Sequence, residues 1–439
     1  MKQRRKIIFT MILLSFFLLI KAEAQQSKTL SLNEAINLGI TNSKQLKLSK
    51  ARIDEAVAAT KQAEEARLPD ASISGSYMRL TRATVDLKTA AGSGTPSFTP
   101  KIDQALYGSA NISMPIYEGS RIKYSIESAK YLEQATRLDA DNDKEQIILN
   151  TIAAYINLYK ANVAARLVEE NLQESRKRDT NFISLEKNGL LARNDLLKSQ
   201  LQTSNIELAL VDAENSIQLA TVNMNLMLGL PETTTLILDS SSITKPSEIK
   251  TIEEYEQLAA QNRNDVQALE YHKKASDAAI RVAKGDYYPN VALTGGYIAA
   301  DIPGFLTITN AVTVGVGVKY SISSFWKTKS KVQQAEARAQ QVQVNEEILN
   351  DNIHLSINES YQNYLSALKK IEVNNKAVEQ ANENYRISKN KYDNNLLLLT
   401  DLLDANVAQL RAKLDLTVSK ADAVLAYYTL QEAAGILKQ

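Results

Sequence analysis

The sequence NGLLARNDLL at residues 188–197 returns, with the same pattern of leucine and aspartate, as NNLLLLTDLL at residues 394–403. The second copy begins 206 residues after the first. An earlier pair, LPDASISGSY at residues 68–77 and YPNVALTGGY at residues 288–297, repeats with an offset of 220 residues. Solenoid repeats have periods of about 20–50 residues. The chain is therefore predicted to contain a duplicated half-molecule.

The predicted halves cover residues 25–230 and 251–439, with a linker at 231–250. The segment before them has a basic start, an apolar run at residues 7–20 and the small-x-small triplet Ala22-Glu23-Ala24. This pattern is typical of a cleaved signal peptide, here residues 1–24. The alternative is an uncleaved anchor, but the run is shorter than the roughly 20 residues that span a membrane.

Composition excludes several classes of function. The formal net charge of +1 argues against a nucleic-acid partner. The chain has no cysteine and only two histidines, His272 and His354, each alone on a predicted helix. No zinc site, thiol nucleophile, disulfide or lipid-bearing cysteine is therefore predicted. We expect no cofactor, no metal and no enzymatic activity.

Helix-breaking residues are distributed unevenly. The chain has 8 prolines, none between Pro115 and Pro231 and none after Pro303. Residues 318–434 contain neither glycine nor proline. Because these two residues end helices, the stretches without them are predicted to form long helices. The expected elements are long helices at about 119–187 and 326–392, returning helices after tips at 188–195 and 393–401, and shorter helices at about 31–67 and 252–286.

Four segments between the helices alternate apolar and small polar residues, which is the period of a strand. They cover residues 71–80, 106–116, 290–299 and 311–321. In an exported chain this pattern is typical of outer-membrane barrel strands, with the apolar face toward lipid. Tyr77, Tyr297 and Tyr320 lie near strand ends and are candidates for an aromatic girdle. The alternative is a half-buried sheet in water.

Four strands cannot close a membrane barrel, whose smallest form has about eight. Open edges cannot face lipid because their amides would be unsatisfied. Several chains must therefore contribute to one barrel. The change of repeat offset places a 14-residue insertion between Tyr77 and Pro115, in the loop that joins the first two strands.

The order helix, two strands, long helix and returning helix, given twice with the tip sequences quoted above, resembles the TolC-type outer-membrane efflux proteins. The resemblance covers about residues 30–435. It implies a homotrimer with a twelve-stranded barrel in outer-membrane lipid, a long helical tunnel in the periplasm and an equatorial patch that includes residues 231–250. It also implies a periplasmic adaptor and an inner-membrane transporter as partners. The fold class is mainly α, with a membrane β-barrel.

The resemblance implies a periplasmic gate of aspartates just after the helix turn. The pattern matches at Asp401 and Asp404, with Asp195 in the first half and Tyr392 beside the second tip. Residues three apart share a helix face, so three chains would present two stacked acidic rings. The alternative is that Asp401 and Asp195 only stabilise a helix start.

The second tip departs from the family pattern. Asn395 replaces the turn glycine that the first half keeps as Gly189, and asparagine tolerates the left-handed conformation. Leu397 stands where well-known members carry an arginine that latches the closed state, so that latch is not expected. Exposed leucines at both tips are predicted to contact the adaptor, or alternatively a neighbouring hairpin. They are Leu190, Leu191, Leu396, Leu397, Leu398 and Leu399.

The sequence therefore predicts a passive exit duct of a tripartite efflux or type I secretion system, which carries small molecules or proteins from the periplasm to the outside. A partner must supply the energy, because the chain has no phosphate-binding Gly-Lys-Ser/Thr loop. The main rival is a non-conducting periplasmic coiled-coil scaffold. An envelope hydrolase is disfavoured by the lack of a nucleophile–base constellation.

Overall fold

A computed structural model describes residues 27–83, 102–239 and 249–437. The predicted signal peptide, most of the inserted loop and residues 240–248 of the linker lie outside the described residues. The chain divides into two compact units. We call them the sheet unit, Ser49–Ala140 with Asn264–Asn350, and the helical unit, Met1–Leu48 with Asp141–Arg263 and Asp351–Gln439, as far as these are described.

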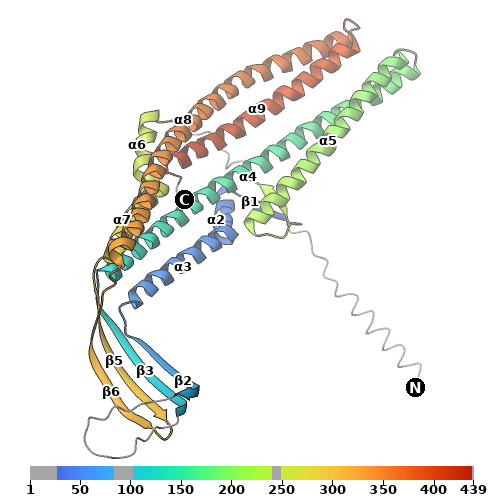
Figure 1. The fold of residues 1–439 in the computed structure, drawn as a ribbon. Coiled ribbons are helices and arrows are strands. Elements are labelled where there is room, and N and C mark those ends of the chain that lie inside the picture. The colour runs from blue at the N-terminus through green and yellow to red at the C-terminus, as the bar shows by residue number, and fades with distance from the viewer. Residues whose placement is uncertain (1–26, 84–101, 240–248, 438–439) are drawn as a thin grey trace, which may run out of the picture. The chain divides into compact units, whose positions relative to one another are not determined.

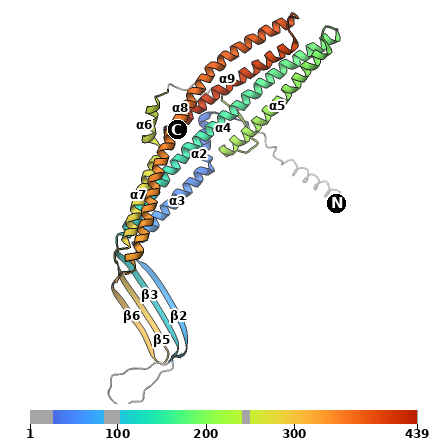
Figure 2. The same ribbon diagram turned by 45° about the horizontal axis from the view of Figure 1, so that its top comes forward.

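The long helices predicted from the missing breakers are present (Figure 1). Helix α4 has 67 residues and α8 has 70 residues, and each is followed by a returning helix. Their bounds are α4 Arg121–Lys187, α5 Arg193–Leu228, α8 Ser324–Asp393 and α9 Leu399–Ala433. The two hairpins α4–α5 and α8–α9 each run antiparallel (Figure 2). The part of the chain that the structure describes has no helix long and apolar enough to cross a membrane.

The shorter helices differ from the prediction, which expected one helix before each strand pair. Each is broken in two, giving α2 Leu32–Asn42 and α3 Lys44–Glu65, then α6 Ile252–Asn262 and α7 Asn264–Gly285. Ser43 leaves the helical conformation, and its hydroxyl accepts the Leu46 backbone N–H at 3.2 Å. A capped break of this kind starts a second helix without any proline or glycine.

A pair of short parallel strands in the helical unit was not predicted. β1 (Ser27–Leu30) pairs with β4 (Thr235–Leu238), which lies in the linker between the halves. The buried hydroxyl of Tyr155 lies 3.0 Å from the carbonyl oxygens of both Leu30 and Asp239, so it bridges the ends of the two strands. The core of the unit surrounds this tyrosine, with Leu30, Ile152, Ile156, Leu228 and Leu236 among its members.

The sheet unit contains four antiparallel strands in the order β2-β3-β5-β6. Their bounds are β2 Asp70–Ala83, β3 Ile102–Glu118, β5 Asn290–Ile302 and β6 Leu306–Lys319, so all four are longer than predicted. The register aligns Ile73, Ala110, Tyr297 and Val312 in one row across the sheet. The apolar residues of the alternation therefore share one face.

That apolar face is exposed within the chain. Ile73, Val312 and Val314 are 90%, 71% and 82% exposed. The opposite face carries small polar residues such as Ser74 and Ser109, whose hydroxyl oxygens lie 2.8 Å apart. Most of the polar face is exposed as well, so neither face of the sheet packs on a core, whereas a sheet in a water-soluble protein packs its apolar face on the core. The half-buried alternative is therefore disfavoured.

Candidate functional site

The two hairpin tips end in the same backbone motif. At the first tip the amides of Gly189 and Leu190 donate to the carbonyls of Glu186 and Leu185, both at 2.9 Å. At the second tip Asn395 and Leu396 repeat these bonds at 2.9 and 2.8 Å. This pattern ends a helix through one residue in the left-handed region. Gly189 has φ 71° and Asn395 has φ 59°, which confirms that asparagine takes the place of the turn glycine.

The leucines of the tips separate into two groups. Leu190, Leu396 and Leu398 are 74%, 75% and 71% exposed, whereas Leu191 and Leu397 are half-buried. The prediction of exposure was wrong for Leu399, which is 4% exposed. Leu399 is the first residue of α9, and its side chain therefore packs inward with the helix.

Leu399 belongs to an apolar cluster, which we call the tip cluster, that joins the two hairpins. Its buried members are Phe182, Leu196, Leu399, Leu402 and Leu403. The ring of Tyr392 packs against Phe182 with a centroid distance of 5.8 Å. Burial and the nearby carboxylates Asp195 and Asp393 raise the pKa of Tyr392, so it stays protonated. Apolar packing therefore joins the two tips, and the residues in contact lie more than 200 positions apart in the sequence.

The predicted acidic residues lie beside this cluster. Asp401 and Asp404 are both exposed and lie one turn apart on α9. Asp195 lies in the first turn of α5 and forms an ion pair with Lys198 at 3.5 Å. Neither helix has a side-chain N-cap, because Ala192 and Leu398 occupy those positions. Favourable interaction with the helix dipole fades after the first turn, so it does not account for Asp404.

Sequence reasoning missed a polar contact that also joins the hairpins. The hydroxyl of Tyr385 on α8 donates to Oε1 of Glu174 on α4 at 2.7 Å. Burial and this bond raise the pKa of Tyr385 well above its usual value. Arg178, one turn after Glu174, is half-buried, and burial lowers the pKa of its guanidinium. Together with Phe182 and Lys389 they line a groove of about 640 Å³.

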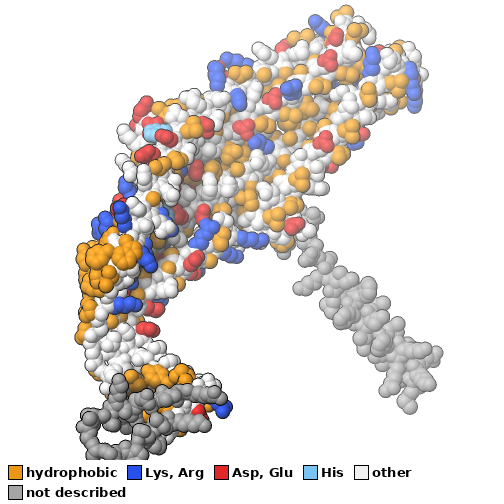
Figure 3. All heavy atoms as spheres, in the orientation of Figure 1, with side chains coloured by type: hydrophobic (Ala, Val, Ile, Leu, Met, Phe, Trp, Pro, Cys, Tyr) orange, Lys and Arg blue, Asp and Glu red, His pale blue; other side chains and the backbone are white. Residues whose placement is uncertain are grey.

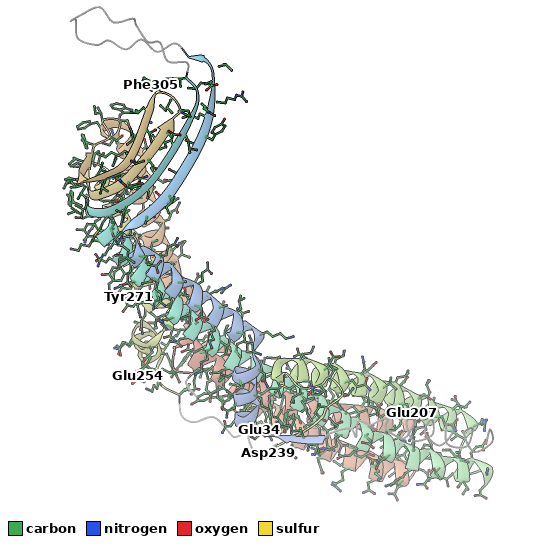
Figure 4. All side chains as sticks on the ribbon, turned by 90° about the horizontal axis from the view of Figure 1, so that it is seen from below. Glu34, Glu207, Asp239, Glu254, Tyr271 and Phe305 are labelled. Atoms are coloured by element: carbon green, nitrogen blue, oxygen red, sulfur yellow. The ribbon has the colours of Figure 1, made fainter. Side chains whose placement is uncertain are left out.

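Arg178 also begins a chain of hydrogen bonds inside the first hairpin. It donates to the hydroxyl of Ser175 at 2.6 Å, and Ser175 lies 2.8 Å from the hydroxyl of Thr203 on α5. Thr203 in turn donates to Asp179 at 2.6 Å. Buried polar groups without partners would be costly, so this chain fixes how α4 and α5 pack. Nearer the middle of the hairpin, Glu207 on α5 (labelled in Figure 4) forms an ion pair with Arg176 on α4 at 2.8 Å.

No cluster of three His, Asp or Glu residues that suits a metal ion occurs among the described residues. His272 lies 3.6 Å from Asp139, and His354 lies 3.1 Å from Glu256. Each histidine has a single acidic neighbour in these pairs.

Residues 35–230 and 256–436 each match the sequence profile described as outer membrane efflux protein. The chain belongs to the outer membrane efflux protein family. Two separate matches to one profile confirm the duplication that the tip sequences predict. The second match begins just after the linker at 231–250.

Relatives of the family support the same conclusion. The chain is 22% identical to the outer membrane efflux protein BepC of Brucella suis over 344 residues, which cover 77% of this chain and 74% of BepC. Among solved structures it is similar to the outer-membrane channel OprN, with a TM-score of 0.77, 17% identity and coverage of 92% and 89% of the two chains. It is also similar to VceC of Vibrio cholerae, with a TM-score of 0.74, 18% identity and coverage of 92% and 96%.

These similarities show that this family member has the TolC-type channel fold, mainly helical with a small sheet. The expected fold class is confirmed. OprN is described as an outer-membrane channel, BepC as an outer membrane efflux protein and VceC as an outer membrane protein.

Proposed function

We propose that the protein is the exit duct of an export system, assembled as a homotrimer in the outer membrane with its hairpins in the periplasm. The observation that carries the proposal is the open sheet. Its edge strands β2 and β6 have no partner strand among the described residues, and its outer face is apolar. Such a sheet is stable in lipid only when its edges are paired.

The strand order allows pairing between copies. Because the four strands alternate in direction, β6 of one copy can pair antiparallel with β2 of the next, and every copy uses the same two edges. Contacts of this head-to-tail kind close into a ring. Three copies give twelve strands, which is within the range of membrane barrels. Two copies would give eight, so the choice of three rests on the family resemblance.

The acidic residues at the tips are proposed to form the gate. In a trimer, Asp401 and Asp404 would each give a ring of three carboxylates, and Asp195 would add to the charge. Such rings attract cations and raise a barrier to anions. Tyr392 and the tip cluster would keep the hairpins together in the closed state.

Closure does not depend on an arginine at position 397. The bond between Tyr385 and Glu174, with Arg178 beside it, supplies a polar contact between the hairpins of one chain. We propose that this contact, together with the tip cluster, resists separation of the hairpins.

The exposed leucines of the tips are proposed to bind a periplasmic adaptor. Leu190, Leu396 and Leu398 would place apolar side chains in water unless another protein covers them. An inner-membrane transporter would supply the energy through that adaptor. The cargo is small molecules or proteins, as in tripartite efflux or type I secretion.

The test is conductance of the purified protein in planar bilayers, together with native mass spectrometry in detergent. The duct predicts discrete channels and a trimer. A coiled-coil scaffold predicts extraction without detergent and no conductance. A monomer that remains folded and soluble without detergent would contradict the duct and favour the scaffold.

A further inference from the structure

The junction between β6 and α8 carries large apolar side chains that the chain does not cover. Ile322, Phe325 and Trp326 are 69%, 65% and 63% exposed. Tyr320 packs against Phe325 edge to face, with a centroid distance of 5.9 Å. In Figure 3 hydrophobic side chains gather at this junction, with Lys and Arg side chains beside them. We call these four residues the junction patch.

The first turns of α8 leave these rings no role in packing. Ser324, Thr328 and Val332 follow one another at helical spacing, and all are buried. They form the inner stripe of the helix, so Phe325 and Trp326 point away from the unit. Packing in the core of the unit therefore does not explain why α8 carries two aromatic rings on its outer face.

The patch continues the apolar face of the sheet. Val312, Val314, Val316 and Val318 alternate along β6, and the alternation carries on through Tyr320 to Ile322. β6 ends at Lys319, so the strand rises roughly 18 Å from Val312 at about 3.3 Å per residue and a tilt of about 40°. Tyr320 and Ile322 prolong the apolar row beyond the strand, toward the height of about 25 Å of the lipid-facing band of membrane barrels. Ile322 and the adjacent rings then lie at one border of that band.

Cations without partners lie next to the rings. Between Asp301 and Glu336 the sequence has no acidic residue, while it has Lys319, Lys327, Lys329 and Lys331. Lys331 pairs with Asp286. No carboxylate among the described residues pairs with Lys327 or Lys329, and both are exposed. The junction therefore places exposed aromatic rings beside lysines whose positive charge no carboxylate neutralises.

The other half of the chain lacks this feature. The offset of 206 residues places Gly119 and Ser120 opposite Phe325 and Trp326. Gly119 has φ 62°, and a side chain there would collide with the carbonyl oxygen of Gly285. At this point the first half turns tightly against the end of α7, whereas the second half carries two aromatic rings on its outer face.

We propose that the junction patch, with Lys327 and Lys329, is a membrane-interface anchor that binds anionic phospholipid headgroups. Aromatic side chains favour the border between hydrocarbon and headgroups, and lysines near the surface attract anionic lipid. The inference rests on the proposed membrane location of the sheet. Beyond that location, it specifies which residues contact the lipid headgroups and that these residues prefer anionic lipids.

The chain offers a direct reporter, because Trp326 is its only tryptophan. The purified protein is reconstituted into liposomes of phosphatidylcholine brominated near the headgroup, and tryptophan emission is recorded. The anchor predicts strong quenching by the brominated lipid and weak quenching by aqueous iodide. Strong iodide quenching without lipid quenching would place the ring in water, and quenching by neither would place it against protein. Either result overturns the anchor.

Lipid charge is tested by comparing brominated phosphatidylglycerol with brominated phosphatidylcholine at equal mole fraction. The wild type should favour phosphatidylglycerol severalfold, up to about fivefold for each lysine. Lys327→Gln/Lys329→Gln should keep the quenching but lose this preference. The matched control is Lys47→Gln/Lys50→Gln, two exposed lysines of α3, which should retain it. A preference unchanged in the first variant would overturn the role of the two lysines.

Conductance measured on the same liposomes separates this inference from the proposed function. Channels that conduct while Trp326 stays unquenched by lipid contradict only the anchor. Protein that neither inserts nor conducts contradicts both.

Discussion

The hydroxyl of Tyr385 lies 2.7 Å from Oε1 of Glu174 and so joins two helices from opposite halves of the duplicated chain. The bond is partly buried and has a charged acceptor, which makes it stronger than a bond between neutral groups in water. It is the polar counterpart of the tip cluster, in which Tyr392 packs on Phe182. The contacts between the two hairpins of one chain therefore include both apolar and polar ones.

Tyr385→Phe should loosen the tips while the protein remains folded. Loss of the hydroxyl removes a hydrogen bond to a carboxylate, worth about 1.5–3 kcal/mol. We expect more frequent channel openings in planar bilayers and an unchanged oligomeric state. The control is Tyr271→Phe, a half-buried tyrosine of α7 in the sheet unit. Opening frequencies equal to the wild type would show that Tyr385 does not restrain the tips.

Replacing both Asp401 and Asp404 with alanine should remove the proposed acidic rings. Six carboxylates near a threefold axis bind cations, so the double variant should lose cation selectivity and become less sensitive to block by trivalent cations. Single-channel recording measures both. The control is Asp415→Ala, an exposed aspartate farther along α9. A helix-start role predicts a different outcome, a stability loss of up to about 1 kcal/mol with selectivity unchanged.

Leu190→Ser/Leu396→Ser should abolish export in cells without affecting the channel itself. Both side chains are exposed and lie outside the buried part of the tip cluster, so folding and conductance should stay near wild type. Crosslinking to the adaptor should fall with export. Leu208→Ser, an equally simple change at an exposed leucine of α5, serves as control. Normal export by the double variant would argue against adaptor binding at these leucines.

Acid should weaken the sheet unit at Asp286. Burial alone would raise the pKa of this carboxyl, but hydrogen bonds from Lys331 and Arg121 outweigh it and lower the pKa below its usual value. A lowered pKa contributes stability that is present above about pH 4 and is lost as the pH falls through the folded-state pKa.

Thermal unfolding in detergent, followed between neutral pH and about pH 3, tests this prediction. Asp286→Asn should be less stable than the wild type at neutral pH, and the difference should shrink in acid. Asp277→Asn, at an exposed aspartate on α7, should behave like the wild type. If the difference in unfolding temperature between Asp286→Asn and the wild type stayed constant with pH, the ionised carboxylate would not contribute to stability.

The sequence by itself determined the features that local pattern controls. Missing breakers predicted α4 and α8 to within about two residues at each end, and alternation predicted all four long strands and the residues of their apolar face. Asn395 was predicted to take the left-handed conformation because few other residues tolerate it. These features depend on residues close together in the chain, and a single sequence contains that information.

Only the tertiary structure decided the contacts between distant segments. The pairing of β1 with β4 and the burial of Leu399 depend on what packs against each residue. Tyr385 and Glu174 are separated by 211 residues, and neither lies in a motif that points to the other. Periodicity says which face of a helix is apolar, but the partner of that face is fixed by the packing free energy of the whole unit.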